Sequence, residues 1–211
     1  LLETNCKAYN DGSTVRYKPT GILQTYGDDD SMAFGLLTGS YTNNTQGGVI
    51  RKNISSFTDE VHPNTGIFTS TSGIVDTIDK LAIATFRYSD YSYNNAGGPG
   101  WITNRPINDG EANDWGNPIA EMMYEGLRYF AGKSSPTVDF SSGVGGSGTF
   151  DSTLGLPLPV WQNPYRTTSG GFESCAKPIQ LVISDINPSY DTDKIPGSSF
   201  NSYTGDLSGL D

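Results

Sequence analysis

The distribution of apolar residues along the chain predicts a few short regular elements separated by long polar stretches. Apolar runs of strand length lie at 32–38, 48–51 and 179–183. Helices are predicted at 18–26, where a proline suits the first helical turn, and at 73–81 and 117–130, where apolar residues have helical spacing. Helices and strands that alternate in this way favour an α/β fold interrupted by surface insertions.

The helix at 117–130 has the clearest pattern. Asn117 is a favourable N-cap, Pro118 fits the first helical position, and Gly132 closes the element. Between them the apolar side chains form one stripe, which consists of Ile119, Met122, Met123, Leu127 and Phe130. Glu121 and Glu125 lie one turn apart in this helix, and we interpret them as solvated surface residues rather than as a catalytic pair.

The apolar run at 179–183 ends abruptly in oxygen-bearing side chains. Such a run is typical of a strand that is covered on both faces, as in a parallel sheet. Open parallel sheets bind ligands beyond the carboxyl ends of their strands. At that place the polar residues recur at every second position, namely Asp185, Asn187, Ser189, Asp191 and Asp193. We therefore predict a metal or ligand loop there.

The same spacing is that of the first calcium ligands in an EF-hand loop. Tyr190 stands where that loop needs a glycine, Pro196 stands where it needs a glutamate, and no flanking helix is predicted. Two interpretations stay open: a looser calcium loop, and a turn capped by Asp185 whose other acids face solvent.

The charge balance narrows the classes of partner. Asp and Glu outnumber Lys and Arg by 23 to 13, which gives a formal net charge of -10. Because nucleic acids and anionic membranes would repel such a chain, cations are the better candidates. No apolar run reaches the roughly 20 residues that a membrane span needs. His62 is the single histidine and no nucleophile motif is present, so we predict that the chain is not an enzyme.

Cys6 and Cys175 are the two cysteines, too few for a disulfide scaffold. They form either one disulfide in an oxidising compartment or two free thiols.

Five phrases of the sequence carry a resemblance to a known family. They are FGLLTGSY at 34–41, GGVIRKNI at 47–54, WITNRPIN at 101–108, WGNPIAEMMYE at 115–125 and AKPIQLVISD at 176–185. Together they resemble the N-terminal region of the PilC/PilY family of type IV pilus tip proteins. The resemblance extends over most of the chain, from about residue 5 to residue 198.

This resemblance implies an α/β fold like that of a von Willebrand factor type A domain, with a Rossmann-like parallel sheet as its core. Long loop and β-hairpin insertions are expected at about 39–72, 88–115 and 134–175. Residues 1–211 would then be a fragment of one such domain, and we expect its first strand upstream of Leu1.

Type A domains commonly bind a cation through three loops at one end of the sheet. Asp185 matches the third loop, and Asn117 takes the place of the threonine of the second, where its amide oxygen can ligate Ca²⁺ or Mg²⁺. Residues 28–33 resemble the first loop superficially, but they precede a strand, and we interpret them as a solvated acidic turn. The adhesion site within this chain is therefore expected to be incomplete.

The function implied by the resemblance is non-enzymatic and extracellular, at the pilus tip on the bacterial cell surface. It comprises adhesion to host or abiotic surfaces and support of pilus assembly and twitching motility. The implied partners are minor pilins, the pilus shaft and the rest of the parent chain. The alternative is a secreted calcium- or carbohydrate-binding module whose aromatic side chains stack on sugars.

Overall fold

The computed structural model describes residues 3–81, 86–87, 89, 92–93, 116–141, 150–166, 168, 170–184 and 194–195. In this part of the chain the strands form three two-stranded antiparallel sheets. They are β1 (Cys6–Asn10), β2 (Val15–Pro19), β3 (Phe34–Thr38), β4 (Val49–Ser55), β5 (Phe86–Arg87) and β6 (Ser92–Tyr93). The helices are α1 (Ile22–Gly27), α2 (Ile74–Lys80), α3 (Ile119–Phe130) and α4 (Phe150–Thr153), with 3-10 turns η1 (Phe57–Asp59) and η2 (Val138–Phe140).

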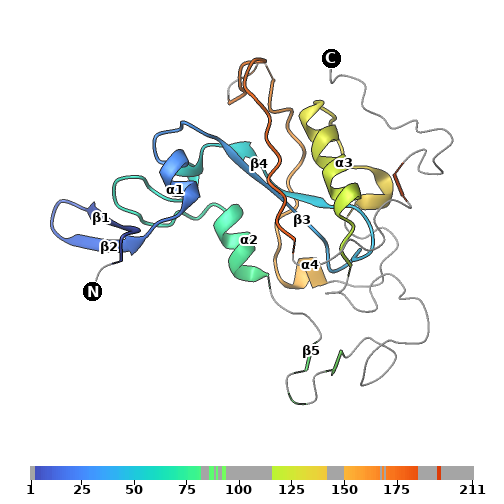
Figure 1. Cartoon of the computed structure of the whole chain (residues 1–211), viewed down its shortest axis with the longest axis horizontal. Coiled ribbons are helices and arrows are strands. Elements are labelled where there is room, and N and C mark those ends of the chain that lie inside the picture. The colour runs from blue at the N-terminus through green and yellow to red at the C-terminus, as the bar shows by residue number, and fades with distance from the viewer. Residues whose placement is uncertain are drawn as a thin grey trace.

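The antiparallel pair of β3 and β4 lies at the centre of the described structure, with α2 and α3 on either side of it in Figure 1. Leu37 is opposite Ile50, and the ladder shifts its register on either side of Leu36. Both strands were predicted from their apolar runs, and both predictions are confirmed, although β4 extends to Ser55.

A small apolar core joins β4 to α3 and to the segment after α4. It contains Ile50, Tyr129 and Trp161, with Leu37 and Ile54 packed against it. The Tyr129 and Trp161 rings meet edge to face, with centroids 5.6 Å apart. The Tyr129 hydroxyl also accepts the backbone N–H of Ile54 at 2.9 Å, so this residue fixes α3 to β4 by packing and by a hydrogen bond.

Strand β4 also carries a buried cation, Arg51, which pairs with an acid from α4. The guanidinium lies 2.6 Å from Asp151 Oδ2, and both side chains are buried. Asp151 accepts two further hydrogen bonds, from the hydroxyl of Ser40 at 2.9 Å and from the backbone N–H of Tyr41 at 2.8 Å. One carboxylate therefore holds α4 and the loop after β3 against β4.

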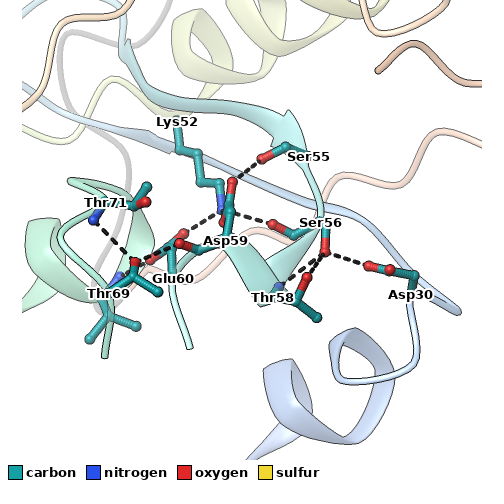
Figure 2. A network of polar contacts seen from close by, with 10 residues as sticks. Asp30, Lys52, Ser55, Ser56, Thr58, Asp59, Glu60, Thr69 and Thr71 are labelled. Atoms are coloured by element: carbon teal, nitrogen blue, oxygen red, sulfur yellow. Dashed lines mark hydrogen bonds and ion pairs between the residues drawn. The ribbon is translucent and has the colours of Figure 1, made fainter. Parts of the chain in front are cut away.

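The next residue, Lys52, is a second buried cation, and Figure 2 shows its network. Its ammonium lies 2.5 Å from Glu60 Oε1 and 2.7 Å from Asp59 Oδ1. Glu60 also accepts the backbone N–H of Val75 in the first turn of α2 at 2.8 Å. A Cβ at Gly73 would lie 2.4 Å from the Glu60 carboxylate, so a larger residue there would displace this carboxylate from its partners. The network thus ties α2 and η1 to β4.

Two helix predictions near the N-terminus have different outcomes. The helix predicted at 73–81 is confirmed as α2. The helix predicted at 18–26 is shorter and begins only at Ile22, because Pro19 pairs with Cys6 as the last residue of β2. Pro19 suits that position because a proline at a strand end need not donate to the ladder.

The prediction of a buried strand at 179–183 is wrong for the structure described. Residues 179–184 are assigned to no strand, and Ile179, Leu181 and Ile183 are exposed. An apolar run becomes a buried strand only where neighbouring strands and covering elements are present. Among the described residues none pairs with it. The von Willebrand factor A-like parallel sheet and the boundaries of its insertions therefore stay predictions.

The buried pair of Arg51 and Asp151 yields a test of this architecture. We expect Asp151→Ala to lower the opening free energy of β4 by about 3–5 kcal/mol, because it leaves a buried cation unpaired. The measurement is hydrogen exchange of the β4 amides. As a matched control, Asp76→Ala removes the partner of Lys80 in a half-exposed pair one turn apart, which contributes less than about 1 kcal/mol. Equal effects of the two substitutions would contradict the proposed role of the buried pair.

Candidate functional site at the start of α3

Helix α3 begins one residue later than the sequence predicted. Pro118 occupies the cap position without a side-chain cap, and Ile119 is the first helical residue. The prediction of Asn117 as N-cap is therefore wrong, and its side-chain amide instead donates to the hydroxyl of Ser184 at 3.0 Å. The predicted end is confirmed. Gly132, at a φ of 75°, follows the helix and donates to the carbonyl of Tyr129 at 3.0 Å.

Residues 179–184 run alongside α3 in the opposite direction. Gln180 Nε2 donates to the carbonyl of Met123 at 3.4 Å, whereas Ser184, further along the segment, meets Asn117 at the start of the helix. In Figure 1 the segment passes beside α3 as a long extended ribbon. The structure thus brings Asn117 to the residue that immediately precedes Asp185, as the prediction of a shared site required.

The predicted metal loop itself lies outside the described residues, and with it Asp185, Asn187, Ser189, Asp191 and Asp193. Both of its flanks are described. Ser184 contacts Asn117 before the loop, and after it the backbone N–H of Lys194 donates to Glu121 Oε1 at 2.8 Å. Both described flanks of the predicted loop therefore contact residues at or just before the start of α3.

Glu121 is wholly buried, which overturns the prediction of a solvated surface residue. Besides Lys194, it accepts the backbone N–H of Gly47 at 2.7 Å through Oε2. Each carboxylate oxygen therefore receives a main-chain donor, and these hydrogen bonds offset the loss of hydration. Glu121 fixes the loop after β3 to the same helical turn that anchors the predicted metal loop.

Glu125 is also wholly buried, so the prediction was wrong here too. It pairs with Arg128 at 3.0 Å and accepts the N–H of Thr137 at 3.1 Å and the Thr137 hydroxyl. Burial raises the pKa of Glu125, and the hydrogen bonds from Thr137 and the charge of Arg128 oppose that rise. This cluster joins α3 to the turn that precedes η2.

The buried face of α3 is therefore not the apolar stripe that the sequence indicated. It consists of Glu121, Tyr124, Glu125, Arg128 and Tyr129, which recur at helical spacing. Met123 and Leu127 of the predicted stripe are exposed instead. The signal that could have revealed this face is the helical spacing of two acids, an arginine and two tyrosines.

The loop after β3 packs closely on the residues that precede α3. A Cβ at Gly116 would lie 1.3 Å from the carbonyl oxygen of Asn44, so glycine is required at this approach. Asn43 is buried beside it and donates to the carbonyl of Asp139 at 2.8 Å. Sequence reasoning treated 39–72 as an insertion and did not foresee that this loop would support Asn117.

The oxygen atoms available at the start of α3 are of the types that ligate hard cations. Amide and hydroxyl oxygens, as on Asn117 and Ser184, are ligand types that Ca²⁺ and Mg²⁺ accept. In the part of the chain that the structure describes, no three His, Cys, Asp or Glu side chains gather closely enough to hold a metal ion. A cation here would therefore depend on the carboxylates of the predicted loop.

The other candidate features lie away from this site. Two open hollows of about 410 and 330 Å³ flank β4, and neither is lined by Asn117, Glu121 or Glu125. Cys6 is half-buried and Cys175 is exposed, both as free thiols, and their pairing stays a prediction. Within the described residues, no helix has the length and apolar character to cross a membrane.

Comparison with known proteins identifies the family. Residues 34–211 match the family described as PilY1 homolog, second domain. It is 45% identical, over 97% of its length, to a protein of Xylella fastidiosa strain Temecula1 named type IV pilus biogenesis factor PilY1 homolog. The chain spans 14% of that relative. It belongs to the PilY1 second-domain family, which confirms the resemblance seen in the sequence. No solved structure matches it.

The raised pKa of Glu125 gives a prediction with a definite sign. The folded protein binds the proton of the Glu125 carboxyl more tightly than the unfolded chain does. Glu125 should therefore destabilise the fold more and more as the pH rises above its ordinary pKa of 4.5. We expect the stability of Glu125→Gln relative to the wild type to increase as the pH rises from 4.5 through the raised pKa of Glu125 in the folded state. Hydrogen exchange of the α3 amides, corrected for the intrinsic effect of pH, measures it.

The exposed Glu173 supplies the control, since Glu173→Gln should leave the pH dependence of α3 unchanged. A relative stability of Glu125→Gln that stays constant or decreases with rising pH would contradict the expected effect of burial.

Proposed function

We propose that this chain is part of a non-enzymatic, extracellular module at the tip of a type IV pilus, where it serves surface adhesion and pilus assembly. The observation that carries the proposal is the 45% identity to a type IV pilus biogenesis factor over nearly the whole chain. Minor pilins, the pilus shaft and ligands on host or abiotic surfaces are its proposed partners, and twitching motility is the proposed output.

Within this function, we propose a cation site at the start of α3. Asn117 and the loop residues Asp185, Asn187, Ser189, Asp191 and Asp193 would hold Ca²⁺ or Mg²⁺. When bound, the cation would supply an open coordination position to an acidic group of a surface ligand. The proposal is supported by the contact of Asn117 with Ser184 and by the return of the chain to Glu121 at Lys194.

A secreted calcium- or carbohydrate-binding module is the second candidate. It is favoured by the same anchoring, because a loop held at both ends can bind calcium for its own stability without an adhesion ligand. In that case the cation would hold the loop in place, and the sugar or protein contacts would lie on other surfaces.

The cation site can be tested by calorimetric titration of the longer protein with calcium and with magnesium. We expect Asp185→Ala to remove one binding event, because the loop loses the first of its proposed carboxylate ligands, and Asn117→Ala to weaken the same event. Asp79→Ala, which removes an exposed acid of α2, is the matched control and should leave the titration unchanged. Identical titrations for Asp185→Ala and the wild type would argue against a site at this position.

The pilus role can be tested in cells that carry the longer protein. We expect deletion of its gene to reduce the number of surface pili, counted by electron microscopy, together with twitching. We expect Asp185→Ala to retain pili but to lose the part of surface adhesion that a calcium chelator removes from the wild type.

Two results would count against these proposals. Normal piliation and twitching in the deletion strain would refute the pilus role. Adhesion of Asp185→Ala that stays chelator-sensitive would refute the cation-dependent part alone.

A further inference from the structure

The side chains of Lys52 and Asp59 meet in a fixed geometry, which Figure 2 shows from close by. Lys52 Nζ lies 2.7 Å from Asp59 Oδ1, and the carboxyl carbon is one bond further. The other oxygen, Oδ2, accepts the hydroxyl of Ser55 at 2.9 Å. A hydrogen bond of this kind orients the carboxylate and withdraws electron density from its carbon. An amine and a polarised carboxyl group are therefore held in contact.

Glu60 supplies a second carboxylate to the same lysine. Its Oε1 lies 2.5 Å from Lys52 Nζ, and the side chains of Lys52 and Glu60 are only 6% and 1% exposed. Its Oε2 accepts the backbone N–H of Val75 at 2.8 Å, which fixes the orientation of the carboxylate. Because burial disfavours separated charges, the ammonium can pass a proton to Glu60 and become a neutral amine. Glu60 thus has the position and the chemistry of a general base.

We propose that Lys52 and Asp59 condense into an intramolecular amide, an isopeptide bond that cross-links β4 to η1. The lone pair of the neutral Nζ attacks Cγ of Asp59, the N–C bond forms, and the bond from Cγ to Oδ1 breaks. Of the three ammonium protons, one stays on the amide nitrogen and two leave with Oδ1 as water, relayed by Glu60. The hydroxyl of Ser55 stabilises the negative charge that develops on Oδ2 during the attack. The step is a dehydration without any change of oxidation state, so it needs no further reactant.

Proximity favours this reaction. A free amine and a free carboxylate stay ionised in water, but groups held in contact react as if one of them were present at about 10⁵–10⁸ M. The released water has a way out, because Lys52 and Asp59 line an open hollow of about 410 Å³ beside β4. Asp59 is the most exposed member of the cluster, with 39% of its side chain accessible, which gives the water a route to solvent.

The pair of Lys80 and Asp76 shows what the cluster adds. Lys80 Nζ also lies 2.7 Å from an aspartate oxygen, and Asp76 also accepts a serine hydroxyl, from Ser72. However, the two side chains are 32% and 35% exposed. The second partner of Lys80 is the carbonyl of Gly155 instead of a carboxylate. Because it lacks both deep burial and a general base, we expect this pair to remain an ion pair.

Peptide mapping of the native protein tests the bond. The protein is unfolded in denaturant, which separates ion pairs but leaves amides intact, and is then digested with trypsin, which cleaves after free lysine and arginine. We expect a peptide of residues 52–80 that is uncut after Lys52 and lighter by one water than its sequence requires. Fragment ions should place the link between Lys52 and Asp59. Cleavage after Lys80 is the matched internal control, since its pair with Asp76 should stay unlinked.

Substitutions separate the roles within the cluster. Asp59→Ala should restore cleavage after Lys52, whereas Asp76→Ala should leave the bond in place. Glu60→Gln keeps the shape of the side chain and one acceptor oxygen but cannot take up the proton. We therefore expect the bond to form at least about 100-fold more slowly in newly synthesised Glu60→Gln than in the wild type.

Two results would count against the proposal. A wild-type digest that yields only residues 53–80, with no loss of water, would overturn the bond itself. A bond that forms in Glu60→Gln at the wild-type rate would overturn the role of Glu60. Neither result bears on the pilus role or on the cation site, which the earlier experiments test separately.

Discussion

The structure depends on the placement of two consecutive cations, Arg51 and Lys52, inside the molecule on strand β4. Successive side chains of a strand point to opposite faces, so each cation needs its own anion on its own side. Arg51 is neutralised by Asp151, 100 positions further along the chain. Lys52 is neutralised by Asp59 and Glu60 in the turn that follows β4. Because an unpaired buried charge costs several kcal/mol, α4 and η1 have little freedom to lie elsewhere.

The need to neutralise buried charge also determines which face of α3 is buried. Its two carboxylates are directed inward, where they accept main-chain N–H groups of Gly47, Lys194 and Thr137, and where Arg128 of the same helix pairs with Glu125. Met123 and Leu127 of the predicted apolar stripe are exposed, whereas Ile119, Met122 and Phe130 are half-buried. The charged residues thus take part of the buried face that periodicity would assign to apolar side chains.

The sequence predicted the elements whose signals are local. β3, β4, α2 and the body and end of α3 follow from apolar runs, helical spacing and a closing glycine. It could not predict the pair of Arg51 and Asp151, because nothing in the intervening residues signals that contact. It also misjudged the burial of 179–183, since an apolar run does not by itself decide whether other elements cover it. The family resemblance assigned Asn117 and Asp185 to one site, but it did not predict the contact of Asn117 with Ser184.

The residues that fix the two ends of the predicted metal loop are not the same as those predicted to bind the cation, apart from Asn117. Glu121 receives a main-chain N–H on each carboxylate oxygen, from Gly47 and from Lys194. Its role is to position the chain after the loop, while Ser184 and Asn117 position the chain before it. A loop whose ends are already fixed loses less conformational freedom when it closes on a cation. Glu121, although no predicted ligand, would thus increase the affinity of the proposed site by preorganisation.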